Sequence, residues 1–336
     1  MRILPLLLAS SALWAQSEQK FAELRDMRLE SGATLASCRV GFRTYGTLDS
    51  ARSNAVLFPT WFSGNTESLA AFLGPDKLVD TSRFFVITVD ALGNGASCSP
   101  SNDPKPFPAI TIRDMVHSQY RLLTEHLGIR RLHAVLGISM GGMQTFEWIA
   151  AYPAFMDRAV PIIGSPKLTS ADLLLWQAEL AAIEAVQKAG ADPRTVMPAV
   201  LAMHQFALTT PRNIVEKTPD SEYPALQAKL EKDARTGMDP LDWAAQLRAM
   251  MAQDISRHYS NSMERAGAAV QAKVLVVAAQ DHMVNPIPAL KLASTAGFDV
   301  LQLNSDCGHM STSCEAARLS AAVASFLREN ARKRTQ

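Results

Sequence analysis

The sequence predicts an α/β fold: a mostly parallel central sheet with helices on both faces, interrupted by a helical insertion. Short apolar runs alternate with helical patterns along much of the 336 residues, and such alternation is typical of parallel βαβ units. The alternation stops after residue 164 and resumes at residue 273. The composition, 48% hydrophobic and 19% charged, suits a packed globular protein.

The predicted sheet domain therefore has two parts, residues 20–164 and 273–334, separated by a helical insertion at residues 165–272. About a hundred residues are too many for an ordinary loop. Near the start, residues 21–48 predict an antiparallel pair of strands that bends at the sequence ESGA.

Short apolar runs predict the parallel strands, because strands covered on both faces are apolar throughout. These runs are residues 55–59, 84–89, 132–137, 159–164 and 274–279. Pro161 is awkward inside a central strand, since proline donates no hydrogen bond. Thr111 and Asp114 predict a capping box at the start of a helix that ends at Gly128.

The first fifteen residues, MRILPLLLASSALWA, have the order of a secretory signal peptide: one arginine, then a short apolar segment. That segment is shorter than the roughly 20 residues of a membrane-spanning helix. Cleavage after Ala12 or after Ala15 stays open, and an uncleaved N-terminal segment is the alternative. We expect a periplasmic or secreted protein with no integral membrane span.

Charge and cysteines restrict the function further. The 33 Lys and Arg nearly balance the 32 Asp and Glu, so nothing favours nucleic acid as a partner. Export permits disulfides. Cys307 and Cys314 are close enough in sequence to pair, with buried free thiols as the alternative. The sequence shows no metal-ligand cluster, phosphate loop or dinucleotide fingerprint, so we expect neither a metal nor a cofactor.

Ser139 stands between Gly137 and Gly141 in the sequence GISMG, after an apolar strand and before a helix. In this context Gly-x-Ser-x-Gly is typical of a nucleophile on a sharp strand-to-helix turn. Side chains in place of the two glycines would collide with neighbouring backbone. The sequence therefore predicts Ser139 as a nucleophile.

A serine nucleophile needs a base, and with this motif the chain order is serine, acid, histidine. His309 follows the last apolar run, residues 299–303, and Asp281 ends the strand before it. We predict Asp281 as the acid, and Asp306 is the alternative.

Two histidines of the insertion, His204 and His258, are in a position to touch substrate but not to act as the base.

The negatively charged oxygen that forms in the reaction needs backbone N–H donors, which together make an oxyanion hole. The N–H of Met140 is one, and the N–H of Trp61 is the other, with Thr60 and Phe62 as alternatives.

These motifs carry a resemblance to a known family. The sequences GISMGGMQTFEW and FPAITIRDMVHSQYRLLTEHLGI resemble the homoserine O-acetyltransferase branch of the alpha/beta-hydrolase fold. The resemblance covers roughly residues 40–164 and returns around Asp281 and His309. It implies a catalytic triad of Ser139, Asp281 and His309, ping-pong acetyl transfer from acetyl-CoA, and an insertion that forms a lid and mediates homodimerisation.

One departure from that family concerns the substrate. Members that acetylate homoserine usually place an Asp directly after the catalytic histidine, where it meets the substrate ammonium. Here the residue is Met310, and a thioether supplies no charge. Arg212 and Arg257 are the candidates for the family's carboxylate-binding arginine, although the motif around them differs.

The expected function is acyl transfer through an acyl-enzyme, with a small-molecule ester or acyl donor as substrate. Hydrolysis of a small ester is favoured, because an exported protein meets little acetyl-CoA. The alternative is an O-acyltransferase with an acceptor other than homoserine. A catalytically silent binding protein, the third hypothesis, has no need of a strained serine.

Overall fold

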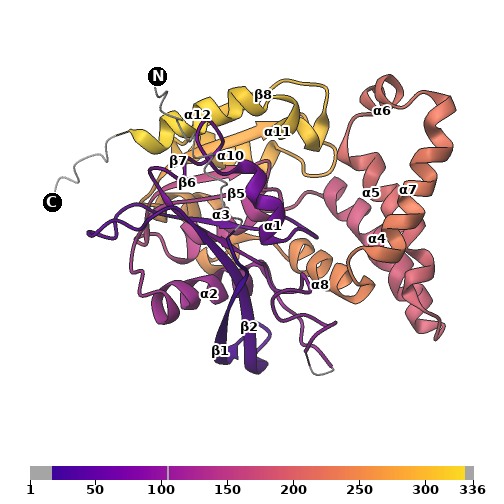
Figure 1. The fold of residues 1–336 in the computed structure, drawn as a ribbon, viewed down its shortest axis with the longest axis horizontal. Helices are drawn as coiled ribbons and strands as arrows, with labels where there is room; N and C mark the ends of the chain where they lie inside the picture. The colour runs from indigo at the N-terminus through magenta and orange to yellow at the C-terminus, as the bar shows by residue number, and fades with distance from the viewer. Residues whose placement is uncertain (1–16, 104–105, 330–336) are drawn as a thin grey trace, which may run out of the picture.

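The computed structural model describes residues 17–103 and 106–329. The predicted signal peptide therefore lies outside the described residues, as do the last positions of the predicted sheet domain. Figure 1 shows a central sheet with helices packed on it and a group of helices standing to one side.

Eight strands form the sheet, in the order β1-β2-β4-β3-β5-β6-β7-β8. Their bounds are β1 (Lys20–Arg28), β2 (Thr34–Tyr45), β3 (Ala55–Pro59), β4 (Phe85–Val89), β5 (Leu132–Ile138), β6 (Met156–Ile162), β7 (Lys273–Ala279) and β8 (Asp299–Leu303). Strand β2 is antiparallel to both β1 and β4, and the other neighbours are parallel. The mostly parallel sheet and the antiparallel pair at its start are confirmed.

The helices alternate with these strands in the sheet domain and follow one another without strands between β6 and β7. Their bounds are α1 (Thr66–Leu69), α2 (Ile112–Arg121), α3 (Met140–Ala151), α4 (Ser170–Lys188), α5 (Met197–Leu208), α6 (Pro211–Lys217), α7 (Tyr223–Thr236), α8 (Pro240–Met251), α9 (Met263–Ala269), α10 (Ile287–Ala296), α11 (Ser311–Cys314) and α12 (Ala316–Arg328). No helix of the described residues is both long and apolar enough to cross a membrane.

Successive side chains of a strand point to opposite faces of the sheet. Both faces of this sheet are buried, because helices pack on each of them. In β3, Ala55 and Leu57 join one apolar cluster, which also contains residues of α2, α3 and α10. Val56 and Phe58 join a second cluster with residues of α12. Helices on both faces of the sheet are thus confirmed.

The predicted capping box is present, and the proline that is awkward in a central strand lies in one. Thr111 and Asp114 form the capping box, with each side chain accepting from the other's backbone N–H. Pro161 lies in β6, a central strand between β5 and β7. On the β7 side the partners in β6 are Arg158, Ala159 and Ile162, so the ladder has no pair at the proline.

We call residues 165–272 the lid segment. It contains α4 to α9, and α4 to α7 lie to one side of the sheet in Figure 1. Near its start, Lys167 forms an isolated antiparallel bridge with Asp254, which follows α8. The ammonium of Lys167 also lies 2.8 Å from a carboxylate oxygen of Asp254. The start of the lid segment is therefore tied to the turn after α8.

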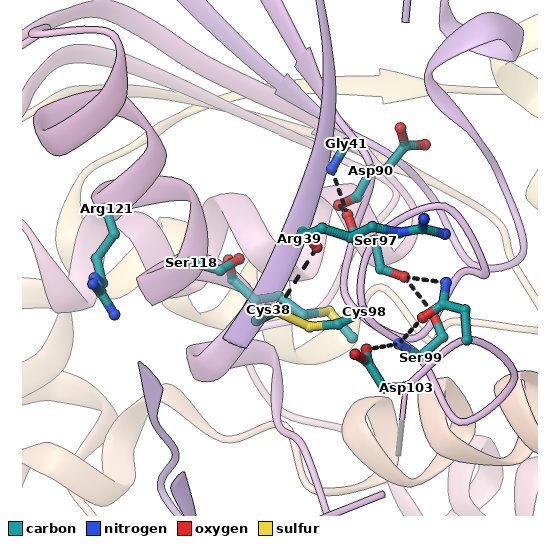
Figure 2. Close-up of a disulfide and its surroundings, with 12 residues drawn as sticks. Cys38, Arg39, Gly41, Asp90, Ser97, Cys98, Ser99, Asp103, Ser118 and Arg121 are labelled. Atoms are coloured by element: carbon teal, nitrogen blue, oxygen red, sulfur yellow. Dashed lines mark hydrogen bonds between the residues drawn. A yellow bond between two sulfur atoms is a disulfide. The ribbon is translucent and has the colours of Figure 1, made fainter. Parts of the chain in front are cut away.

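All four cysteines form disulfides, Cys38–Cys98 and Cys307–Cys314. Of the alternatives that the sequence left open for Cys307 and Cys314, the structure shows the bridge. The other disulfide, Cys38–Cys98, was not predicted from the sequence. It joins β2 to the loop after β4 (Figure 2). Next to it, the hydroxyl of Ser97 donates to the carbonyl oxygen of Asp90 at 2.6 Å.

Candidate active site

Ser139 occupies a strained backbone position between β5 and α3. Its φ is 60° and its ψ is −120°, a conformation that residues with a side chain adopt only at an energetic cost. The Ser139 N–H donates to the carbonyl oxygen of Ile162 at 2.9 Å, which holds the turn against β6. The serine is therefore presented at the carboxyl edge of the sheet and at the N-terminus of α3, where negative charge is stabilised.

The two glycines of the motif are required by close backbone contacts. A Cβ at Gly137 would lie 2.2 Å from the carbonyl oxygen of Gly141, and a Cβ at Gly141 would lie 2.8 Å from that of Pro59. Both distances are shorter than a carbon and an oxygen can approach. The collision predicted from the sequence is confirmed.

The structure joins Ser139, His309 and Asp281 in one hydrogen-bonded chain. Nε2 of His309 lies 2.8 Å from Oγ of Ser139, and Nδ1 lies 2.5 Å from Oδ2 of Asp281. His309 belongs to the short 3-10 turn Gly308–Met310. The other oxygen of Asp281 accepts from the N–H of Met283 at 2.8 Å. Asp281 and His309 are both buried, so water competes little for these bonds.

Asp306, the alternative acid, has other partners. Its Oδ1 accepts from the hydroxyl of Thr210 at 2.8 Å. Its Oδ2 lies 3.6 Å from the guanidinium of Arg212. Of the two candidate acids, the structure brings Asp281 to His309.

The loop after β3 approaches the start of α3. The N–H of Thr60 donates to the carbonyl oxygen of Val89 at 3.0 Å, so it is already used inside the sheet. Trp61 and Phe62 both line the cavity at Ser139. Of the three residues considered for the second oxyanion donor, Trp61 and Phe62 therefore remain candidates, and Thr60 does not.

A relay of buried amides fixes this loop to α3. The indole N–H of Trp148 donates to Gln119 Oε1 at 2.7 Å, and Gln119 Nε2 donates to Gln144 Oε1 at 2.6 Å. Gln144 Nε2 then donates to the carbonyl oxygen of Thr60 at 3.0 Å. Because every donor has an acceptor, the relay holds the loop at a defined distance from Met140, the first residue of α3.

A cavity of about 370 Å³ lies between the sheet domain and the lid segment. Apolar and aromatic side chains predominate in its wall. From the sheet domain the wall contains Trp61, Phe62, Ser63, Phe72, Ile138, Ser139, Ile163, Met283, His309, Met310, Thr312 and Ser313. From the lid segment it contains Trp176, Leu201, His204, Gln205, Leu208, Lys229, Leu230, Asp233, Trp243 and Met250.

Of the three substrate-binding residues predicted from the sequence, one lies in the cavity wall and two do not. Met310 lines the cavity beside His309. Arg212 and Arg257 are not in the cavity wall. Arg212 pairs with Glu216 on the surface, and the guanidinium of Arg257 lies 3.5 Å from Glu30.

Of the two histidines of the lid segment, only one lies in the cavity wall. His204 lines the cavity, whereas His258 pairs with Glu30 at 2.9 Å. Sequence reasoning missed Gln205, Lys229 and Asp233 of the cavity wall. No motif marks them, since only the folding of the lid over the sheet brings them to Ser139.

Comparison with known proteins identifies the fold family. The sequence model described as "alpha/beta hydrolase fold" matches residues 55–312, more than half of the chain. The chain belongs to the alpha/beta hydrolase fold family. The chain order of Ser139, Asp281 and His309 is the order typical of this family.

Relatives within the family include both esterases and acyltransferases. A probable esterase of Corynebacterium glutamicum is 38% identical over 177 residues, which is 51% of each chain. A homoserine O-acetyltransferase of Geotalea daltonii is 39% identical over 164 residues, 42% of this chain and 44% of the relative. The matches thus span about half the length of these curated relatives.

The structural likeness extends over nearly the whole chain. The crystal structure of an acetylester hydrolase from Corynebacterium glutamicum superimposes with a TM-score of 0.85 at 25% identity. The superposition covers 94% of this chain and 97% of that one.

Proposed function

We propose that the protein hydrolyses small acetyl esters through an acyl-enzyme on Ser139. The observation that carries the proposal is the hydrogen-bonded chain Ser139–His309–Asp281, which opens into a mainly apolar cavity. The likeness to an acetylester hydrolase and to a homoserine O-acetyltransferase supports the acetyl group.

In the first half of the proposed reaction, Oγ of Ser139 attacks the ester carbonyl while Nε2 of His309 takes its proton. The carbon–oxygen bond that forms leaves negative charge on the former carbonyl oxygen. The N–H of Met140 and that of Trp61 stabilise this charge. Asp281 holds the imidazole by its Nδ1–H and stabilises the positive charge that develops on His309.

Collapse of the tetrahedral intermediate breaks the bond to the alcohol, which leaves with the proton from His309. In the second half, His309 takes a proton from water as the water oxygen attacks the acetyl group on Ser139. The bond between the acetyl carbon and Oγ of Ser139 then breaks, Ser139 takes the proton back from His309, and acetic acid leaves and ionises in water. No cofactor takes part in any of these steps.

Hydrolysis is favoured over transfer to homoserine by the cavity wall. Met310, next to His309, supplies no charge for a substrate ammonium, and neither Arg212 nor Arg257 reaches the cavity. The second candidate function, O-acetyl transfer from acetyl-CoA, is favoured by the 39% identity to a homoserine O-acetyltransferase.

The test compares wild type with Ser139→Ala on p-nitrophenyl acetate, and on acetyl-CoA with and without homoserine. We expect steady turnover of the ester by wild type, none by Ser139→Ala, and no consumption of acetyl-CoA. Consumption of acetyl-CoA only when homoserine is present would establish the transferase instead. If neither substrate reacts, a fluorophosphonate is applied to the protein. Labelling of Ser139 would show that the triad works and that the right ester was not supplied, whereas no labelling would show that the triad is inactive.

Export and dimerisation are part of the same proposal. The disulfides Cys38–Cys98 and Cys307–Cys314 support an oxidising compartment. Fractionation of cells that express the full chain tests export. Light scattering tests the dimer that the family resemblance implies.

A further inference from the structure

In the lid segment, a histidine of the cavity wall pairs with a buried carboxylate, apart from His309 and Asp281. Nδ1 of His204, on α5, lies 3.2 Å from Oε1 of Glu179, on α4. The imidazole packs against the rings of Phe62 and Trp243, with centroid distances of 5.5 and 5.0 Å. Phe62 follows Trp61, so His204 lies against the loop that approaches Ser139.

Glu179 is completely buried, and both of its oxygens are used. Oε1 faces His204, and Oε2 accepts from the indole N–H of Trp243 at 3.1 Å. Among the described residues no lysine or arginine pairs with it, and burial of such a carboxylate is costly. A carboxylate only accepts hydrogen bonds, so Nδ1 of His204 carries the hydrogen. The carboxylate therefore fixes both the orientation and the tautomer of the imidazole.

Nε2 of His204 is the ring nitrogen left over. Among the described residues it has no hydrogen-bond partner, and the side chain lines the cavity. Much of the surrounding wall is apolar, including Phe62, Trp243 and Leu201. Nearby, Lys229 and Asp233 satisfy each other at 2.5 Å. Nε2 is thus an oriented polar atom on a largely apolar surface.

We infer that Nε2 of His204, oriented by Glu179, binds a hydroxyl group on the alcohol part of the ester substrate. A hydroxyl donates to Nε2 of a neutral imidazole and accepts from Nε2–H of an imidazolium, so it satisfies the pair in either state. An alkyl group does neither. The inference rests on the proposed function, because an acetyl group has no hydroxyl and the alcohol must supply it.

The experiment uses two esters of nearly equal size, 2-hydroxyethyl acetate and propyl acetate, which differ by a hydroxyl in place of a methyl group. For the wild type we expect kcat/KM to favour the hydroxyl ester by about tenfold, the effect of one oriented hydrogen bond. His204→Phe keeps a ring against Phe62 and Trp243 but removes Nε2. It should bring the ratio of the two kcat/KM values close to one.

Glu179→Gln is the second variant, in case His204→Phe does not fold. Its amide offers one acceptor where the carboxylate offers two, so the imidazole is held less firmly and the ratio should fall. A purely structural role of Glu179 would lower both rates equally. Gln205→Leu, at another polar position of the wall, is the matched control and should keep the wild-type ratio.

The outcomes separate the inference from the proposed function. Turnover of neither ester by the wild type would overturn the proposed function. Turnover of both with a ratio near one, or with a ratio that His204→Phe does not change, would overturn the inference alone. A ratio lost in Gln205→Leu and kept in His204→Phe would assign the hydroxyl to Gln205.

Discussion

The disulfide between Cys307 and Cys314 closes a short segment of chain that contains His309. The two cysteines are seven positions apart, and the turn Gly308–Met310 lies between them. Nδ2 of Asn213, from the lid segment, also lies 3.6 Å from Sγ of Cys307. The proposed base is therefore carried on a cross-linked loop that touches the lid.

Opening this disulfide should affect activity more than stability. The double variant Cys307→Ser/Cys314→Ser should lose about 2.5 kcal/mol of unfolding free energy, the value that the chain-entropy model gives for so short a loop. We expect kcat to fall more than tenfold, because His309 is no longer held at Ser139. Urea unfolding and initial rates on p-nitrophenyl acetate measure the two effects.

The other disulfide is the control for this prediction. Cys38 and Cys98 are 60 positions apart, so Cys38→Ser/Cys98→Ser should lose more stability, about 4 kcal/mol. The protein that stays folded should keep most of its kcat. Equal losses of kcat in the two double variants would show that the Cys307–Cys314 bridge does not position His309.

The backbone strain at Ser139 should lower the free energy of unfolding, and two substitutions at this position should reveal the difference. Ser139→Gly removes the Cβ that makes a φ of 60° and a ψ of −120° unfavourable, whereas Ser139→Ala keeps it. Both variants should be inactive. The glycine variant should have the larger free energy of unfolding, by about 1 kcal/mol after its extra backbone entropy is subtracted. Identical urea midpoints would mean that the turn stores no strain.

The amide relay to Thr60 should act on kcat. Gln144→Leu removes the donor to the carbonyl oxygen of Thr60, so the loop that carries Trp61 is no longer fixed to α3. A displaced oxyanion donor should lower kcat about tenfold with little change in KM. Thr145→Val, which removes a bond to Gly141 on the same helix, is the control. An equal effect in the control would refute a role for the relay.

Glu147 predicts a pH dependence of stability. Burial raises its pKa from 4.5 to about 7, although the guanidinium of Arg113 opposes the shift. Between pH 4.5 and 7 the native state keeps a proton that the unfolded state has lost. The free energy of unfolding therefore falls as the pH rises through this window.

The variant Glu147→Gln has no such proton to lose. Between pH 4 and pH 8, the wild type should lose stability relative to the variant by on the order of 3 kcal/mol. Urea unfolding of both proteins at several pH values measures this difference. A difference that does not change with pH would contradict the raised pKa.

Much of the fold follows from local sequence patterns. Apolar runs bounded by turn residues located the strands, and β3 has the predicted bounds. The strand β6 begins at Met156, three residues before the predicted start, because Met156 pairs with Leu132 of β5. Such pairing is set between strands, and a single strand's pattern does not contain it.

The sequence by itself determined the nucleophile motif, the order of Ser139, Asp281 and His309 along the chain, and the division into a sheet domain and a helical insertion. These features are local, since they depend on neighbouring residues and on the position of strand ends. The tertiary structure decided which distant residues meet.

The choice of Asp281 over Asp306, the exclusion of Arg212 and Arg257 from the cavity, and the pairing of Cys38 with Cys98 all depend on contacts between separate elements. The same holds for Glu179 and His204, which lie on different helices and meet only because α4 and α5 pack together. These contacts form only when the folded chain brings separate elements together, and no local sequence pattern records that.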